Sequence, residues 1–288
     1  MFQSRLQQAA AQVQDHLRDV MAPLAPPVGA AMRHACAGGK HMRAFLVLEG
    51  AALHGVPGDL AIWPAAGIEA MHAYSLVHDD LPCMDDDDLR RGQPTVHRKW
   101  DEATAVLTGD ALQALAFELV ADPRGCADAK ARADLVLALA QAAGVRGMVG
   151  GQAMDIAAES ASTPLTLDQI TTLQAGKTGA LIEWAACAGP RMAGADPTAL
   201  RHYAQALGLA FQIADDILDV TGDEARTGKR LKKDAEAGKA TFVSLLGLDG
   251  ARARARSLAD QACDALDPYG TQAETLRQAA RFVISRDS

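Results

Sequence analysis

Apolar residues recur at helical spacing along almost the whole chain, and this pattern limits the possible folds more than any other feature. Over residues 2–22, one face of a helix is marked by Leu6, Ala10, Val13 and Leu17. Alanine and leucine fill the later stretches, whereas only 4% of the residues are aromatic. Because small and straight-chain side chains lose little rotamer freedom in a helix, the sequence predicts an all-α fold.

Short breakers rich in glycine and proline separate the other predicted helices. These helices cover about residues 45–54, 61–82, 101–120, 127–145, 167–188, 197–218 and 241–248, with a C-terminal pair within 250–285. None of the breakers resembles a domain linker, so we expect one domain over residues 1–288. The stretch from Asp223 to Lys239 has too little apolar content to pack, and we expect it to form a mobile surface loop.

Charge and cysteine content exclude several classes of protein. The 28 Lys and Arg against 36 Asp and Glu give a net charge of -8, which argues against a nucleic-acid partner. The five cysteines are scattered without a Cys-x-x-Cys pair, so neither a disulfide framework nor a zinc site is expected. The sequence shows no signal-peptide core and no apolar run of about 20 residues, so we expect a cytoplasmic protein without a membrane span.

The segment FQIADDILDV at 211–220 carries three aspartates in an apolar helical context. Asp215 and Asp219 are four residues apart and lie on one face of the helix, with Asp216 beside them. Like charges at this spacing destabilise a helix unless a cation bridges them, and oxygen ligands suit a hard dication. A solvated acidic face is the competing interpretation, but the apolar flanks favour a metal site.

A second acidic cluster, HDDLPCMDDDDLRRG at 78–92, ends an apolar helix. Pro82 breaks the helical register after Asp79 and Asp80, so either Asp85 or Asp86 could return to the face of Asp79. Arg90 and Arg91 follow directly. Carboxylates, a dication and guanidinium groups together indicate a site that binds a diphosphate.

Other cations stand beside glycine or hydroxyl residues and fit the same kind of site. For each alone a solvated side chain is the simpler account, but together in an acidic protein they support diphosphate binding. They are Lys40 and Arg43 after Gly38-Gly39, Lys177 before Thr178, Lys229 after Gly228 and Lys239 after Gly238.

Taken together and in order, these motifs resemble the trans-isoprenyl diphosphate synthase (polyprenyl synthetase) family, most closely its bacterial-type farnesyl diphosphate synthases. The resemblance covers nearly the whole chain. It is carried by GGKHMR at 38–43, EAMHAYSLVHDDLPCMDDDDLRRGQPTVH at 69–97, TGDAL at 108–112, GGQAMD at 150–155, GKTGAL at 176–181, FQIADDILDVTGD at 211–223 and GKATFVSLLG at 238–247.

The resemblance implies a single large helical bundle around a central cavity and a homodimer. It also implies Mg²⁺-dependent head-to-tail condensation of an allylic diphosphate, dimethylallyl or geranyl, with isopentenyl diphosphate. The allylic diphosphate ionises, the isopentenyl double bond attacks, and a proton is lost with the departing diphosphate as base. The product implied is (2E,6E)-farnesyl diphosphate, with geranylgeranyl diphosphate as second choice and geranyl diphosphate as a further alternative.

Residue roles follow from the resemblance position by position. Three Mg²⁺ ions and the allylic diphosphate would be held by Asp79, Asp80, Asp85, Asp215, Asp216 and Asp219. The same diphosphate would be contacted by Arg90, Lys177, Lys229 and Lys239. Isopentenyl diphosphate would be bound by Lys40, Arg43, His72 and Arg91. The developing allylic cation would be lined by Thr178 and Gln212.

Two local features bear on the product and on substrate affinity. Tyr74 and Ser75 lie five and four positions before Asp79, and an aromatic residue there, with the insertion Pro82-Cys83, resembles enzymes that stop at C15. His41 and Ala44 stand where the family usually has Arg and Pro. A weaker helix start after Arg43 would loosen the isopentenyl site without changing its identity.

Three other interpretations compete with this one. Glu69 and His72 form an ExxH element of the kind that builds di-iron bundles, but no second such element occurs in the sequence. Terpene cyclases and head-to-head prenyl condensing enzymes share the acidic magnesium motifs, and the match at Lys40, Arg43 and His72 argues against them. A non-catalytic prenyl synthase subunit would show decayed motifs, whereas both acidic motifs are intact here.

Overall fold

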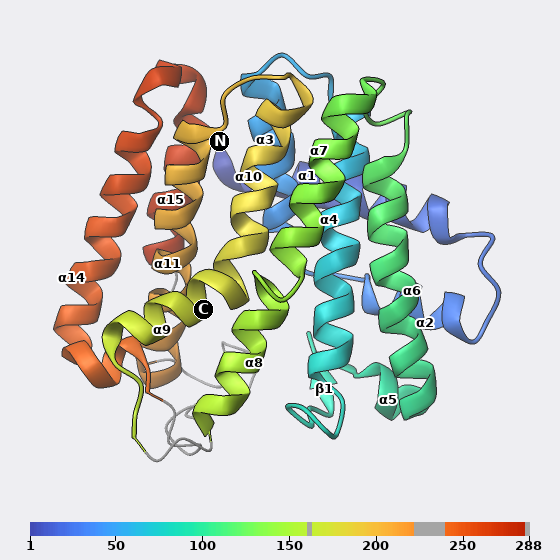
Figure 1. Cartoon of the computed structure of the whole chain (residues 1–288), viewed down its shortest axis with the longest axis horizontal. Coiled ribbons are helices and arrows are strands. Elements are labelled where there is room, and N and C mark those ends of the chain that lie inside the picture. The colour runs from blue at the N-terminus through green and yellow to red at the C-terminus, as the bar shows by residue number, and fades with distance from the viewer. Residues whose placement is uncertain (160–162, 222–239, 286–288) are drawn as a thin grey trace. The chain divides into compact units, whose positions relative to one another are not determined.

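The computed structural model describes residues 1–159, 163–221 and 240–285, and it is built from helices (Figure 1). The predicted all-α fold is confirmed. The elements are α1 (Phe2–Met21), α2 (Val28–Ala35), α3 (Met42–Leu53), α4 (Gly58–Asp79), β1 (Leu89–Arg90), β2 (Gln93–Pro94), α5 (Val96–Lys99), α6 (Glu102–Ala121), α7 (Ala129–Ala143), α8 (Met148–Glu159), α9 (Leu167–Gln174), the π-helical turn η1 (Ala175–Gly179), α10 (Ala180–Met192), α11 (Thr198–Thr221), α14 (Phe242–Ala265), the 3₁₀ helix η2 (Asp267–Ala273) and α15 (Glu274–Ile284). Within the described residues, strand is confined to the antiparallel hairpin of β1 and β2.

Contacts between residues group the chain into two compact units. The first contains residues 3–137 and 188–195, and the second contains residues 138–187 and the chain from Asp196 onward. One domain over residues 1–288 therefore stays a prediction.

Helix α4 forms the centre of the first unit and packs against α3 and α6 (Figure 1). Most of its residues between Ala61 and Val77 are buried. Helix α6 begins where the sequence predicts, because Asp101 accepts a hydrogen bond of 2.6 Å from the N–H of Thr104 and so caps the first turn. This packing holds the acidic C-terminal end of α4 in place.

The second unit is organised around α11, which packs against α14 and α15 (Figure 1). The hydroxyl of Tyr203 on α11 is buried and donates to the carbonyl of Leu276 on α15 at 2.9 Å. Helix α14 is interrupted at Gly247, whose φ is +70°. This break agrees with the separate short helix predicted over residues 241–248.

Several elements differ from the sequence expectation. Helix α4 ends at Asp79, three residues before Pro82, because Pro82 has no N–H to continue the helix and Leu81 directly before it disfavours the helical conformation. Helices α2, α5 and α8 and the hairpin of β1 and β2 were not predicted, and the predicted helix over residues 167–188 contains the π-helical turn η1. The predicted surface loop from Asp223 to Lys239 lies outside the described residues, as do Lys229 and Lys239.

Two stretches are long and apolar enough to span a membrane by length and composition alone, namely Glu102–Ala121 and Ala129–Glu159. The first stretch is α6, and 50% of its apolar window is buried within the protein. The second consists of α7 and α8 separated by a turn at 144–147. The absence of a membrane span stays a prediction.

Candidate active site

The acidic end of α4 is shaped by a turn that folds back on the helix. The N–H of Asp85 donates to the carbonyl of Asp79 at 2.8 Å, and the N–H of Asp86 donates to the carbonyl of Leu81 at 3.2 Å. Asp86 adopts a left-handed conformation with a φ of +49°. Of the two aspartates that could return to Asp79, Asp85 is the one whose backbone bonds to it.

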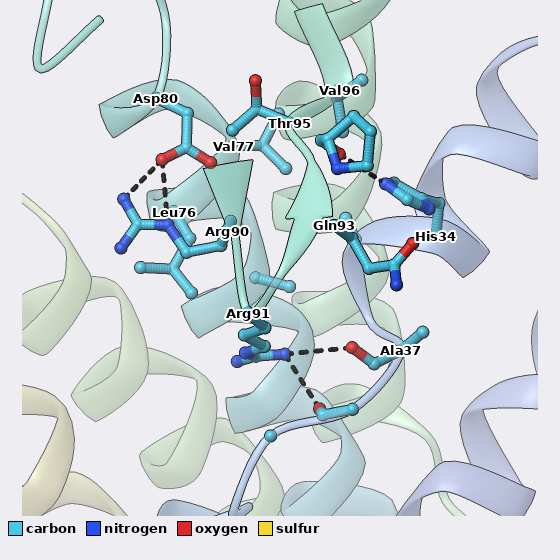
Figure 2. Close-up of a pocket in the computed structure, with 15 residues that line it drawn as sticks. His34, Ala37, Leu76, Val77, Asp80, Arg90, Arg91, Gln93, Thr95 and Val96 are labelled. Carbon is cyan, nitrogen blue, oxygen red and sulfur yellow. Dashed lines mark hydrogen bonds and ion pairs between the residues drawn. The ribbon is translucent and has the colours of Figure 1, made fainter. Parts of the chain in front are cut away.

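Asp80 is bound by an arginine of the hairpin that follows (Figure 2). Its side chain is buried, and its Oδ1 accepts hydrogen bonds from Nε of Arg90 at 2.9 Å and from Nη2 of the same guanidinium. Nη2 also lies 3.3 Å from Oδ2 of Asp87. Burial raises the pKa of Asp80, and the Arg90 guanidinium opposes this shift. Asp80 therefore fixes the position of Arg90.

Two further arginines, Arg43 and Arg91, lie near His72 in the same unit. Arg91 donates from Nη1 to the carbonyls of Gly38 at 2.9 Å and Ala37 at 3.3 Å, which joins the hairpin to the loop before α3 (Figure 2). The buried Nε of Arg43 has no hydrogen-bond partner in the structure. Burial lowers the pKa of His72 well below 6.5, and the charges of Arg43, Arg91 and Arg90 lower it further. Three guanidinium groups thus lie close enough to His72 to lower its pKa, and positive charge of this kind suits an anion.

The loop before α3 also carries Lys40, whose side chain is exposed. Together with the previous group, this gives the first unit all four cationic or polar residues that the resemblance assigns to isopentenyl diphosphate: Lys40, Arg43, His72 and Arg91.

A cavity of about 370 Å³ adjoins this group. Its walls come from the end of α2, one face of α4 and the hairpin (Figure 2). Asp80, Arg90 and Arg91 line it together with apolar groups such as Leu76 and Val77. The cavity therefore has a charged side and an apolar side.

The two residues predicted to set chain length lie one turn below the aspartates on α4. Tyr74 is 9% exposed, its ring contacts that of His78 edge-on with 5.2 Å between centroids, and its hydroxyl bonds to Gln113 of α6. Burial raises the pKa of Tyr74, and the negative charge of Asp79 raises it further. Ser75 donates its hydroxyl to the carbonyl of His72 at 2.9 Å, within its own helix. Tyr74 is thus the bulky, fixed member of the pair.

In the second unit, a chain of hydrogen bonds joins three elements. The hydroxyl of Thr178 donates to Oε1 of Gln212 at 3.3 Å, and Nε2 of Gln212 donates to Oδ1 of Asp216 at 3.0 Å. Oδ2 of Asp216 accepts the N–H of Phe242 at 2.8 Å. The buried carboxylate of Asp216 therefore holds Gln212 on α11 and the first residue of α14.

Lys177 lies on the π-helical turn η1 and forms an ion pair with Asp155 of α8, with 2.6 Å between Nζ and Oδ2. The turn approaches α8 so closely that a Cβ on Gly151 would stand 2.1 Å from the backbone nitrogen of Lys177. Asp155 has no role in the sequence interpretation. The motif GGQAMD, which contains both Gly151 and Asp155, was the signal that could have indicated it.

The remaining acidic side chains suit a hard dication. Asp79, Asp215 and Asp219 are half-buried and Asp85 is exposed, and all four offer only oxygen ligands. Within the described ranges no group of three or more His, Cys, Asp or Glu residues is arranged to hold a metal ion.

Comparison with known proteins identifies the family. The profile of the polyprenyl synthetase family matches residues 26–279. The farnesyl diphosphate synthase of Escherichia coli strain K12 is 44% identical over 300 residues, and the match covers 99% of this chain and 99% of that one. The chain therefore belongs to the polyprenyl synthetase family. It is a prenyltransferase, as the sequence predicts.

Two solved structures have the same fold. An FPP/GFPP synthase from Zymomonas mobilis superposes with a TM-score of 0.90 at 44% sequence identity, covering 98% of both chains. A geranyltransferase from Helicobacter pylori, complexed with magnesium and isoprenyl diphosphate, superposes with a TM-score of 0.81 at 32% identity, covering 98% of this chain and 96% of that one. Both confirm the predicted all-α fold of the family.

Proposed function

We propose that this prenyltransferase makes (2E,6E)-farnesyl diphosphate by Mg²⁺-dependent head-to-tail condensation of dimethylallyl or geranyl diphosphate with isopentenyl diphosphate. The observation that carries the proposal is the acidic end of α4 directly beside the arginines that surround His72. Such a pairing of carboxylates with arginines suits a reaction of two diphosphates, one of which arrives with metal ions. The similarity to a farnesyl diphosphate synthase over the full chain supports the same product.

Mg²⁺, with three ions expected, would be held by the aspartates whose carboxylates remain half-buried or exposed. These are Asp79 and Asp85 in the first motif and Asp215 and Asp219 in the second. When bound, Mg²⁺ neutralises the charge that grows on the leaving diphosphate. The second aspartate of each motif is buried and bonds to protein groups. Asp80 accepts from Arg90, and Asp216 accepts from the N–H of Phe242.

The chain's own cations assist ionisation of the allylic substrate. Arg90 is fixed by Asp80, and Lys177 is fixed by Asp155, so both would meet the diphosphate without first having to be ordered. Lys229 and Lys239 would add two further contacts. Thr178 and Gln212 present oxygen atoms from a rigid hydrogen-bonded chain, where they can stabilise the allylic cation.

Isopentenyl diphosphate would bind to Lys40, Arg43, His72 and Arg91. The buried Nε of Arg43 would gain the hydrogen-bond acceptor that the protein does not supply. Because the departing diphosphate takes the proton, no protein nucleophile or base is needed. Apolar walls such as Leu76 and Val77 help to exclude water, which would otherwise quench the cation.

The test of this proposal is a product assay. Purified protein is incubated with dimethylallyl diphosphate, labelled isopentenyl diphosphate and Mg²⁺, and the dephosphorylated products are sized by chromatography. We expect a C15 alcohol that disappears when EDTA removes the metal. A C20 product would retain the reaction but reject farnesyl diphosphate, and a cyclised hydrocarbon without elongation would reject the whole proposal.

Variants of the two acidic motifs test the metal assignment. We expect Asp79→Ala and Asp215→Ala each to lower kcat by about 10³-fold or more, since each removes charge stabilisation from the transition state. Helix content measured by circular dichroism should not change. Near-normal turnover in either variant would contradict the assignment.

We further propose that the enzyme is a cytoplasmic homodimer. Light scattering should then give about twice the chain mass of 30.2 kDa. A monomeric mass with full activity would contradict this part of the proposal.

A further inference from the structure

Helix α3 begins in an unusual way. Its preceding residue, His41, is in a left-handed conformation with a φ of +48°, and the His41 side chain does not cap the helix. The first N–H groups of a helix need acceptors from outside it. Here the N–H of Ala44 donates to Oε1 of Glu69 at 2.9 Å, so a carboxylate from α4 serves as the cap of α3.

The second oxygen of Glu69 contacts His41. Nδ1 of His41 lies 3.1 Å from Oε2 of Glu69, and only 3% and 5% of the two side chains are exposed. Nε2 of His41 lies 3.1 Å from Nε2 of Gln14 on α1. Since an amide nitrogen can only donate, His41 accepts on Nε2 and carries its proton on Nδ1, the ring nitrogen that lies near Glu69. Both carboxylate oxygens therefore lie close to the segment 41–44.

Two residues predicted to bind the substrate, Lys40 and Arg43, lie in or next to this segment. Lys40 directly precedes His41, and Arg43 stands between His41 and Ala44. Burial raises the pKa of Glu69, but the hydrogen bond and charge of His41, the charge of Arg43 and the N–H of Ala44 together bring it below its usual value. Glu69 is thus a carboxylate that holds the backbone on both sides of Arg43 and balances its buried charge.

We propose that Glu69 and His41 together position Lys40 and Arg43 for isopentenyl diphosphate. This inference rests on the proposed function. Neither residue needs to touch the substrate, so both are positioning residues. The loop from Gly38 to Arg43 is the part they hold in place.

The test separates the two substrates kinetically. In Glu69→Gln and in His41→Ala, we expect KM for isopentenyl diphosphate to rise about tenfold, while kcat and KM for geranyl diphosphate change less than twofold. The double variant should be no worse than the more affected single variant, because both changes release the same loop. Glu69→Asp keeps the charge but is too short to bond as before, so it should lie between wild type and Glu69→Gln.

A matched control is available on α3 itself. Glu49 is also buried and pairs with Arg5 at 2.6 Å, but it lies two turns beyond Arg43. Glu49→Gln removes a comparable buried charge, and KM for isopentenyl diphosphate should stay within twofold of wild type. An equal rise in KM in this control would overturn the inference, because it would show a general effect of losing a buried ion pair.

Binding measurements complete the test. Isothermal titration of isopentenyl diphosphate without allylic substrate should show the same loss of affinity in Glu69→Gln and His41→Ala. If wild type fails to elongate or to bind isopentenyl diphosphate, the proposed function itself fails. If wild type elongates and both variants keep its KM, only the positioning role fails. Should Glu69→Gln not fold, His41→Ala decides the question alone.

Discussion

At the scale of single residues, the two acidic motifs divide their aspartates between two tasks. The second aspartate of each motif, Asp80 or Asp216, is buried and bonded to protein groups. The outer aspartates, Asp79 and Asp215, remain half-buried. The inner members thus hold Arg90 and the start of α14, and under the proposed function the outer members would offer oxygen to Mg²⁺.

Tyr74 gives a prediction about product length. Replacing it by alanine removes a buried ring one turn below Asp79, so the growing chain should extend further. We expect Tyr74→Ala to make C20 and longer products, measured by chromatographic sizing of the dephosphorylated alcohols. Tyr74→Phe keeps the ring and loses only the hydroxyl that bonds to Gln113, so this control should still stop at C15. A C15 product from Tyr74→Ala would place the limit on chain growth elsewhere.

The contacts of single residues show which parts of the site could be predicted from the sequence and which could not. Both acidic motifs and the cations Lys177 and Arg43 are recognisable because they are local patterns. The partners that hold the cations are not, since Asp80 reaches Arg90 across a turn and a hairpin, and Asp155 reaches Lys177 from another helix. Such pairs depend on how elements pack, which no spacing rule encodes.

At the scale of elements, the bounds of α1 and α6 were predicted to within one residue, whereas those of α3, α4 and α11 differ from the prediction by up to three residues. Helix α1 was expected over 2–22 and α6 over 101–120, and Asp101 supplied a clear start for α6. Helix α8 was missed because the glycines at 150 and 151 resemble a breaker. The structure uses Gly151 for close packing against η1, which is a tertiary effect that overrides local propensity.

The contact from α11 to α14 predicts a structural role for Asp216. Asp216→Ala leaves the buried N–H of Phe242 without an acceptor, which costs about 1–3 kcal/mol of unfolding free energy. Urea unfolding in the absence of Mg²⁺ measures this loss. Asp215→Ala is the control and should change the midpoint far less, because its carboxylate is half-buried. Equal losses in the two variants would contradict the division of tasks between these neighbours.

Close packing of α10 on α3 gives a second prediction at this scale. A Cβ on Gly189 would stand 2.2 Å from the carbonyl carbon of Gly50, and backbone atoms cannot move aside as a flexible side chain can. We expect Gly189→Ala to lower the unfolding free energy by about 1–3 kcal/mol, measured by urea unfolding. Gly58 at the start of α4 has no neighbour within 4 Å of a Cβ, so Gly58→Ala should be neutral or slightly stabilising.

At the scale of the whole molecule, stability should depend on pH through two histidines. Burial lowers the pKa of both His16 and His72 below 6.5. The unfolded chain therefore binds protons below about pH 6.5 that the folded chain does not, and the unfolding free energy falls as the pH falls. Each such proton contributes a slope of about 1.4 kcal/mol per pH unit.

Urea unfolding at pH 7.5 and pH 5.5 tests this dependence. The loss of stability between the two conditions should be smaller in His72→Gln than in wild type, because the variant has one fewer group to protonate on unfolding. His202 is exposed on α11, and His202→Gln serves as control. If His72→Gln loses as much stability as wild type, the burial of His72 does not govern the effect.

The family could be predicted from the sequence because seven motifs occur in a fixed order along the chain. The all-α class followed from helical spacing together with few aromatic residues. The oligomeric state and the presence of one domain did not follow in the same way. They depend on which helix faces meet, and amphipathic spacing gives only the faces.

The π-helical turn η1 also bears on how this gene can change in length. A π turn holds one residue more than the α-helical turn it replaces, so η1 is equivalent to a single-codon insertion in a helix running from Leu167 to Met192. Deleting one codon there would restore a continuous α-helix and keep the flanking turns in register, because the π turn already absorbs the extra residue. The residues of the turn itself would shift, so a deletion that folding tolerates would still disturb the ion pair between Lys177 and Asp155.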